Sequence, residues 1–258
     1  MSRQARFRWK IGVILFFFLG PTESNAERAA NTIRQTREYA ICMRLARVSP
    51  EEGFESALVW SDDGGGDAAQ HCAAVALYSM GQFREAAIRF HRLAQTIKEN
   101  DAVRSNLLAQ AGQAWHQAGD IDRAYVAYST ALNLTPNAPE IRVDRAIVLA
   151  ERGRYEEAVD DLDVALDVNG RMVEALVLRA SARRYLNALE LALQDASRAL
   201  GLSPAHPGAL LERGMIARLQ GRPEDARHDW LKILRLYDGT LAADTAKRNL
   251  EILDVTSQ

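Results

Sequence analysis

The chain of 258 residues is poor in the side chains that build catalytic and metal centres. It has two cysteines and five histidines, and no GxSxG, Walker or dinucleotide-binding motif occurs. The histidines never form an HxxxH pair or another short ligand spacing. They are His71, His91, His116, His206 and His228. The sequence therefore predicts neither a metal nor a cofactor, and it disfavours an enzyme.

Long apolar runs are also missing. The longest, residues 11–19 (IGVILFFFL), is far short of the roughly 20 residues that span a bilayer. Four basic residues precede it, and the small residues Ser24 and Ala26 follow it. This layout is typical of a secretory signal peptide, residues 1–26, cleaved after Ala26, with a permanent anchor as the weaker alternative. We expect an exported, soluble protein without a membrane anchor after cleavage, periplasmic if the source is bacterial.

Concentrated basic charge is the third absence. Removing the leader takes away four basic residues and one acid, which leaves a net charge of about −5. No basic cluster remains that would attract nucleic acid or an anionic membrane surface. We therefore expect no nucleic-acid partner.

What the chain does have is a repeat of 34 residues. Gly119, Gly153 and Gly221 lie at multiples of this interval, and Asn187 fills the missing place. Both residue types tolerate a left-handed turn. Alanine follows each of these positions by five residues, and a small residue precedes each by seven. These positions are Ala124, Ala158, Ala192 and Ala226, and Gly112, Ala146, Ala180 and Gly214. Such spacing indicates two closely packed helices in each copy.

The repeat resembles the tetratricopeptide repeat (TPR) family, whose members have 34-residue helical hairpins. The resemblance rests on GQAWHQAGDIDRAYVAYSTALNLTP (residues 112–136), RGRYEEAVDDLDVAL and QGRPEDARHDWLKIL. It implies an all-α solenoid of stacked hairpins with a right-handed superhelix. Two positions depart from the family pattern: Arg183 replaces a core residue of a first helix, and Gly170 replaces a terminal proline.

The repeat divides the chain into segments. A degenerate helical hairpin is expected over residues 27–66, and a closing helix over 241–258. A four-residue insertion falls near residues 95–102, and SDDGGGD (residues 61–67) lacks calcium-loop spacing, so we expect a flexible connector there. The five repeats are expected at residues 67–104, 105–138, 139–172, 173–206 and 207–240.

Cys42 and Cys72 would fall on the first helices of adjacent hairpins. A disulfide between them is geometrically feasible in an oxidising compartment, and two small buried thiols are the alternative.

The acid-rich stretch at residues 156–163 could bind a metal or face water. Asp161 recurs in phase as Asp195 and Asp229, and an arginine precedes each by sixteen residues. We interpret these as structural ion pairs within each hairpin, in preference to pairing with the arginine of the next copy, and place the other acids in solvent. The predicted pairs are Arg145 with Asp161, Arg179 with Asp195, and Arg213 with Asp229.

First helices line the concave groove of proteins that this chain resembles, where extended peptides or partner domains bind. The phases of that groove imply the following binding residues in this chain: His71, Tyr78, Asn106, Gln113, His116, Gln117, Glu140, Glu151, Ser181, Arg184, Tyr185 and Arg218. The Lys/Asn set with which family members hold a C-terminal carboxylate is missing, which disfavours that binding mode.

Two functions follow as hypotheses. The first is a non-catalytic, exported scaffold or adaptor for a peptide or partner protein, in envelope assembly or maintenance. The alternative is an enzyme or enzyme subunit whose superhelix binds a glycan or another small ligand. An open groove would favour the first, and a deep pocket with a convergent acid and base would favour the second.

Overall fold

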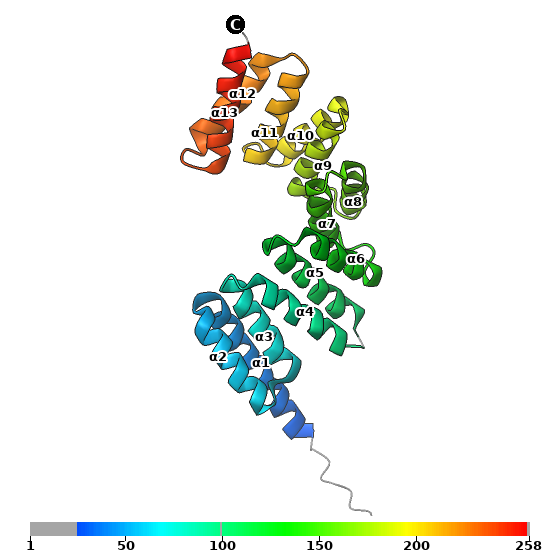
Figure 1. Cartoon of the computed structure of the whole chain (residues 1–258), viewed down its shortest axis with the longest axis vertical. Helices are drawn as coiled ribbons and strands as arrows, with labels where there is room; N and C mark the ends of the chain where they lie inside the picture. Colours follow the sequence, from blue (N-terminus) through cyan, green and yellow to red (C-terminus); the bar gives the residue numbers. More distant parts are fainter. Residues whose placement is uncertain (1–24, 99, 257–258) are drawn as a thin grey trace, which may run out of the picture.

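The computed structural model describes residues 25–98 and 100–256, which fold into a curved stack of α-helices (Figure 1). The expected leader, residues 1–26, lies outside this part apart from its last two residues. The first five helical segments are α1 (Asn25–Val48), α2 (Pro50–Trp60), the π-helical turn η1 (Ser61–Gly65), α3 (Gly66–Ser79) and α4 (Phe83–Thr96). The next four are α5 (Asp101–Gln117), α6 (Ile121–Leu134), α7 (Pro139–Glu151) and α8 (Tyr155–Val168). The last five are α9 (Val173–Tyr185), α10 (Leu189–Leu202), α11 (Pro207–Leu219), α12 (Pro223–Leu236) and α13 (Leu241–Thr256).

The turns inside the hairpins explain the repeated glycines. Gly119 has φ 74° and Gly153 has φ 72°, and Asn187 takes the same left-handed conformation with φ 59°. A residue with a Cβ is strained there, but asparagine tolerates the region better than most. The 34-residue periodicity is therefore a periodicity of tight left-handed turns between paired helices.

Small residues on the first helices let the second helices approach closely. A Cβ at Gly112 would lie within 2.8 Å of the Tyr128 ring, and one at Gly214 would overlap the Trp230 indole. Tyr128 and Trp230 are buried in the two largest apolar clusters of the described residues. The aromatic residue of the second helix thus occupies the space that the missing side chain leaves.

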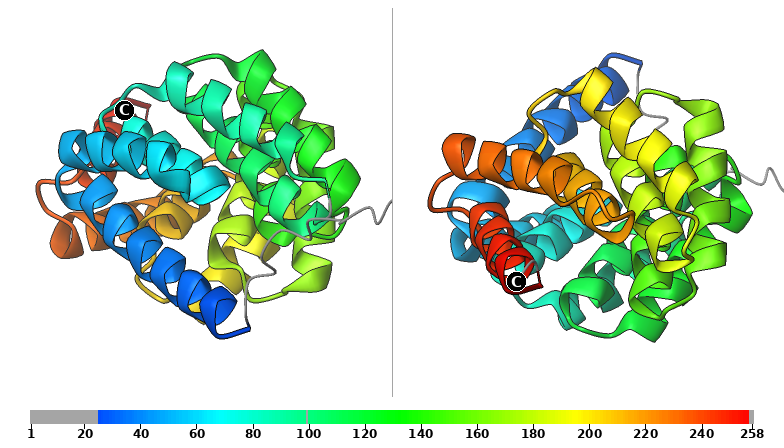
Figure 2. Two further views of the ribbon diagram at one scale, coloured as in Figure 1. Left: turned by 90° about the horizontal axis from the view of Figure 1, so that it is seen from below. Right: turned by 90° about the horizontal axis from the view of Figure 1, so that it is seen from above.

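The helices stack into a right-handed, all-α solenoid of the expected class, and the stack curves around a central axis (Figure 2). Second helices such as α6 and α8 lie on the outer side of the curve, and first helices such as α5 and α7 lie inside them (Figure 1). Each of the two largest apolar clusters spans several neighbouring hairpins, as a solenoid requires.

The four-residue insertion is an extra helical turn at the start of α5. This helix has 17 residues, whereas α7, α9 and α11 have 13 each. The linkers before α5 and before α7 have equal length, residues 97–100 and 135–138, so the additional residues lie within the helix. Four residues make about one turn, which keeps the apolar face of α5 in phase.

The SDDGGGD stretch, where the sequence predicts a flexible connector, adopts a helical turn with a kink. It forms the π-helical turn η1 and the start of α3, with positive φ at Gly64 (86°) and Gly66 (52°). Gly65 is buried, and a Cβ there would meet the Trp60 ring. The glycines therefore permit a sharp, closely packed kink between α2 and α3.

The ends of the stack are formed by an N-terminal hairpin, α1 and α2, and by α13. Cys42 of α1 and Cys72 of α3 form a disulfide with a Cα–Cα distance of 6.1 Å, and both are buried. At the other end, Ala246, Leu250 and Leu253 of α13 join the apolar cluster of the last repeats. Within the described residues, no helix combines the length and apolar character that crossing a bilayer demands.

Candidate functional site

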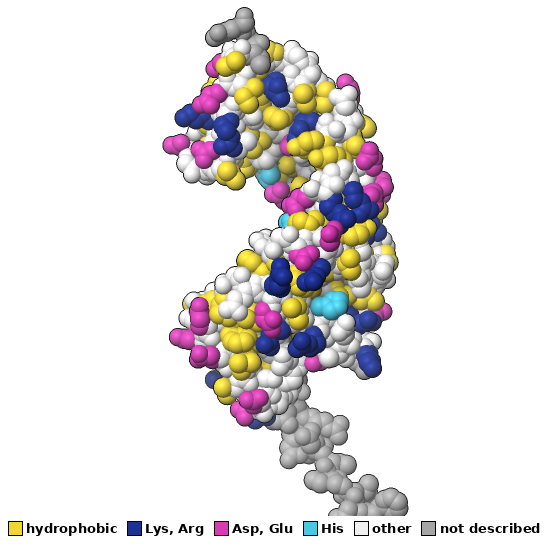
Figure 3. Space-filling model, viewed as in Figure 1, with side chains coloured by type: hydrophobic (Ala, Val, Ile, Leu, Met, Phe, Trp, Pro, Cys, Tyr) yellow, Lys and Arg dark blue, Asp and Glu magenta, His cyan; other side chains and the backbone are white. Residues whose placement is uncertain are grey.

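The inner side of the curve forms an open hollow between the two ends of the molecule (Figure 3). First helices supply this side, because they lie inside the second helices of the stack (Figure 1). The twelve residues that the family resemblance assigns to the groove lie on α3, α5, α7, α9 and α11. Their surroundings differ widely, and only some of them offer free side chains.

A pocket of about 220 Å³ lies between α7 and α9 near the middle of this side. Three of the predicted groove residues, Glu151, Ser181 and Tyr185, line it together with Tyr155 and Leu178. The ring of Tyr185 stacks on that of Tyr155 with centroids 4.6 Å apart and planes within 3° of parallel. Since Tyr185 remains 58% exposed, part of a fixed aromatic side chain is open to a partner.

Arg184 holds this aromatic pair from the α9 side. Its guanidinium carbon lies 4.4 Å from the centre of the Tyr185 ring, and its Nε donates to Glu212 Oε2 of α11 at 2.7 Å. Burial opposes the charge of Arg184, but the hydrogen bonds and charge of Glu212 raise its pKa. Arg184 is therefore a fixed cation that positions Tyr185, and its charge is already balanced by Glu212.

Two predicted groove histidines are bound to neighbouring hairpins. His116 Nε2 donates to Glu151 Oε1 at 2.9 Å and joins α5 to α7. His71 Nε2 donates to Gln110 Oε1 at 3.0 Å, while its Nδ1 accepts from the Tyr39 hydroxyl at 2.8 Å. Burial lowers the pKa of His71, so it is neutral at pH 7. Both rings act as connections along the groove.

The remaining predicted residues divide by exposure. Asn106, Gln113, Gln117 and Glu140 are exposed, and their side chains are available to a partner. Tyr78, Ser181 and Arg218 are half-buried. Tyr78 packs edge-on against Phe83 with ring centroids 5.2 Å apart. The amides of α5 thus form a polar surface next to the aromatic pocket of α7 and α9.

Sequence reasoning missed Asp144, which lies on α7 between Glu140 and the α7–α9 pocket. Burial raises its pKa to about 6, the charge of His116 opposes this shift, and Glu140 reinforces it. The phase of the repeat could have identified it, because Gln110, Asp144 and Glu212 occupy one position in the first helices α5, α7 and α11, and α9 has Leu178 there. Gln110 binds His71 and Glu212 binds Arg184, whereas Asp144 has no hydrogen bond or ion pair among the described residues.

The three arginine–aspartate pairs are present in the described structure. Arg145 and Arg213 each donate two hydrogen bonds of 2.7 Å to Asp161 and Asp229, and Arg179 donates two, of 2.9 Å and 2.6 Å, to Asp195. Each aspartate side chain is 3–5% exposed. These pairs join the two helices of each hairpin near its buried seam.

The network also extends between hairpins, through Asp163 and not through the aspartates that the alternative pairing assigned to the next copy. Asp163 was placed in solvent, but it accepts from Arg179 of the next hairpin at 2.6 Å. Arg183, the departure from the family pattern, donates to Asp195 at 2.6 Å. Its charge therefore has a partner where an apolar residue would have packed. Elsewhere in the described residues, no group of three or more His, Cys, Asp or Glu side chains could hold a metal ion.

Comparisons with known proteins agree with this architecture. The sequence profiles of two tetratricopeptide repeat families match residues 116–177 and 177–239. Tetratricopeptide repeat protein 36 of Bos taurus is 31% identical over 159 residues, which cover 60% of this chain and 76% of that protein. Hsc70-interacting protein 1 of Drosophila melanogaster is 32% identical over 98 residues, covering 38% of this chain and 26% of that protein.

Among solved structures, a tetratricopeptide repeat protein from Parabacteroides merdae is similar with a TM-score of 0.70 and 15% identity. The match covers 85% of this chain and 88% of that one. At this level of identity the likeness concerns the fold alone, and it extends over nearly the whole described stack.

Proposed function

Because this chain belongs to the tetratricopeptide repeat family, we propose that it is a non-catalytic scaffold that binds a peptide or a partner protein in its concave groove. The observation that carries the proposal is the exposed Tyr185 ring, which is fixed by Tyr155 on one side and by Arg184 on the other. A rigid aromatic side chain beside open polar groups is a favourable anchor for a protein partner. One relative of part of the chain is named for its interaction with Hsc70, which is consistent with a protein partner.

The alternative, a site for a glycan or another small ligand, receives less support from this groove. The pocket of about 220 Å³ is smaller than the roughly 300–1,000 Å³ of typical small-molecule sites. Glu151 is the single carboxylate that lines it, and no histidine lines it with Glu151. A shallow pocket on an open surface suits one side chain of a larger partner.

Export to an oxidising compartment, in envelope assembly or maintenance, is part of the same proposal. Its support is the leader-like segment at residues 1–26 and the disulfide that the structure contains. Intact-mass measurement of protein recovered from the native host tests both features. We expect a chain that begins at Glu27 and loses two mass units on oxidation; an unprocessed, fully reduced chain would contradict export.

The groove itself is tested by site-specific photo-crosslinking in the native host. A photoreactive residue at Tyr185 should crosslink to a defined partner, whereas one at Glu156, an exposed position of the second helix α8, should not. Affinity capture with the triple variant Gln113→Ala/Gln117→Ala/Arg184→Ala should lose the same partner. An unchanged set of partners, together with equal crosslinking from Glu156, would show that the concave groove is not the binding surface.

A further inference from the structure

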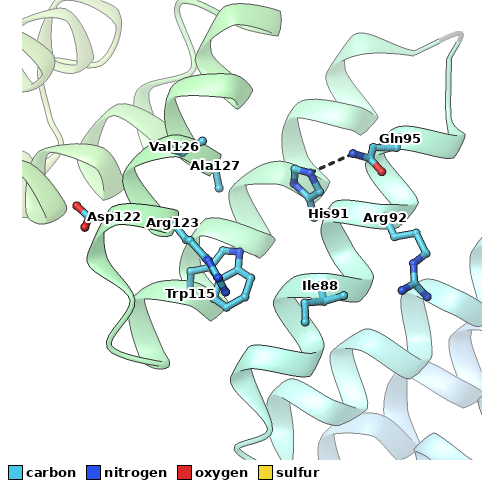
Figure 4. A pocket seen from close by; sticks show the side chains of 9 residues that line it. All are labelled: Ile88, His91, Arg92, Gln95, Trp115, Asp122, Arg123, Val126 and Ala127. Atoms are coloured by element: carbon cyan, nitrogen blue, oxygen red, sulfur yellow. Dashed lines mark hydrogen bonds between the residues drawn. The ribbon is translucent and has the colours of Figure 1, made fainter.

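A second groove lies on the outer side of the stack, between α4 and α6 (Figure 4). It encloses about 450 Å³ and is lined by one face of each helix, with Trp115 of α5 between them. The face of α4 consists of Ile88, His91, Arg92 and Gln95, which have the i, i+3, i+4, i+7 spacing of a helical surface stripe. These are second helices, so the groove is separate from the concave groove proposed above.

The groove lies where the repeat departs from its own pattern. The extra turn lies at the N-terminal end of α5, and Trp115, near its C-terminal end, occupies the phase that holds Leu77, Leu149, Arg183 and Ala217 in other first helices. The Trp115 ring is 7% exposed, and it both fills the core and forms the floor of the groove. Among α3, α5, α7, α9 and α11, only α5 has an aromatic residue at this phase.

The walls of the groove are apolar and accessible. Ile88 on α4 is 38% exposed and Val126 on α6 is 60% exposed. Both side chains line the groove whose floor is formed by Trp115. Exposed aliphatic side chains that converge on a buried indole are typical of surfaces that receive apolar side chains from a partner. Two turns of α4, residues 88–95, span about 10 Å, which matches two successive turns of a docked helix.

The rim of the groove is positively charged. Arg123 lies over the Trp115 ring, 4.6 Å from its centre, and its nearest carboxylate is that of Asp120 at 3.5 Å. Arg92 has no ion pair or hydrogen bond among the described residues. The one lining acid, Asp122, is engaged by Arg152. Two guanidinium groups therefore flank an apolar floor: that of Arg92, which has no ion pair among the described residues, and that of Arg123, which is paired with Asp120.

We propose that this groove is a second docking surface, which takes the apolar face of an acidic amphipathic helix from a partner protein. Leucine-sized side chains of the partner contact Ile88, Trp115 and Val126, and flanking carboxylates meet Arg92 and Arg123. Charge complementarity selects the acidic partner, because a basic helix would bring like charges to both rims. The contact is short, so it serves as a transient interaction alongside the concave groove.

The test uses the full chain after residue 26 and a fluorescein-labelled synthetic helix with leucines at i, i+3, i+4 and i+7 and glutamates elsewhere. A matched peptide has lysines in place of the glutamates. Fluorescence anisotropy should show binding of the glutamate peptide and at least about tenfold weaker binding of the lysine peptide. In NMR spectra, the indole signal of Trp115, assigned with Trp115→Phe, should shift on binding, and that of the buried Trp230 should not.

Two variants with matched controls locate the interaction. Val126→Glu should weaken binding about tenfold, whereas Val168→Glu, at a similarly exposed valine of α8, should not. Arg92→Glu should weaken it severalfold, and Arg171→Glu, an equal change of charge at another exposed arginine, should not. All four positions are on the surface or half-exposed, so the variants keep the fold.

Several results would overturn the proposal. The proposal is wrong if the glutamate peptide does not bind, or if both peptides bind equally. It is also wrong if Val126→Glu binds the peptide with unchanged affinity. Loss of peptide binding in the concave triple variant, with no shift of Trp115, would assign the peptide to the other groove. A Trp115 shift that grows with protein concentration in the absence of peptide would make a second copy of this chain the occupant and not an acidic partner.

Discussion

Arg213→Ala removes the sole charged partner of a buried carboxylate. Asp229 is 3% exposed and accepts two hydrogen bonds of 2.7 Å from Arg213. No other residue in the described part of the chain forms an ion pair or hydrogen bond with it. The other two buried aspartates differ, because Asp161 also binds Arg142, and Asp195 also binds Arg183. The three aspartates therefore form a graded series within one fold.

The size of the effect follows from this burial. Leaving a fully desolvated charge without its partner costs about 3–5 kcal/mol. The Arg213 side chain is 34% exposed, so water can replace part of what it provides. We therefore expect Arg213→Ala to lower the free energy of unfolding by about 2–3 kcal/mol. For a chain of this size, that corresponds to a fall in Tm of about 5–10 °C.

Equilibrium unfolding in guanidinium chloride, followed by far-UV circular dichroism, measures this loss. Arg142→Ala should cost less, because Arg145 still binds Asp161. Glu157→Ala, at an exposed acid of α8, should leave stability unchanged. The double variant Arg213→Met/Asp229→Leu should regain most of the stability, because no charge is then left buried. The reasoning is refuted if Arg213→Ala is no more destabilising than Glu157→Ala.

Three further predictions concern pH, packing and the disulfide. Burial raises the pKa of Asp144 from 3.8 to about 6, so the folded chain loses stability as the pH rises through about 4 to 6. Asp144→Asn should remove up to about 3 kcal/mol of this loss, as measured by unfolding experiments at pH values from 4 to 8. Gly214→Ala should destabilise the fold by about 1–3 kcal/mol, because the new methyl group overlaps the Trp230 indole. Gly201→Ala, where there is open space, should stabilise it by about 0.5–1 kcal/mol, and thermal melts of the two variants measure both effects. Reducing the Cys42–Cys72 disulfide, which closes 30 residues, should cost about 3–4 kcal/mol and raise hydrogen exchange in α1 and α2; exchange that stays unchanged would contradict its role.

The fold could be predicted because its determinants repeat. A single glycine says little, but Gly119, Gly153 and Gly221 in phase with Asn187 define a backbone conformation that the structure shows at each position. The same phase relation led to the pairing of Arg145 with Asp161. A residue type that indicates a conformation only weakly at one position indicates it strongly when it recurs at the same position of several repeats.

Features that occur only once in the chain were not predicted, because no second copy repeats them. The partner of Asp163 depends on how far Arg179 reaches across a hairpin boundary, and no second copy repeats that carboxylate. The engagement of His71 by Tyr39 and Gln110 joins three hairpins, so it requires their relative positions. The groove over Trp115 lies between α4 and α6 of neighbouring hairpins, so it requires their relative positions. Contacts between repeats are decided by superhelical geometry, which residue spacing does not encode.

Two arginines of the first helices also join neighbouring hairpins. Arg145 reaches back to Ser129 of the preceding hairpin, and Arg179 reaches back to Asp163 in the same way. Ser197 holds the corresponding phase for Arg213, but no hydrogen bond joins them, and a space of about 380 Å³ separates the two side chains and their neighbours. This row of arginine contacts therefore connects hairpins through the middle of the solenoid but not before α11, where Arg184 of α9 binds Glu212 of α11 instead.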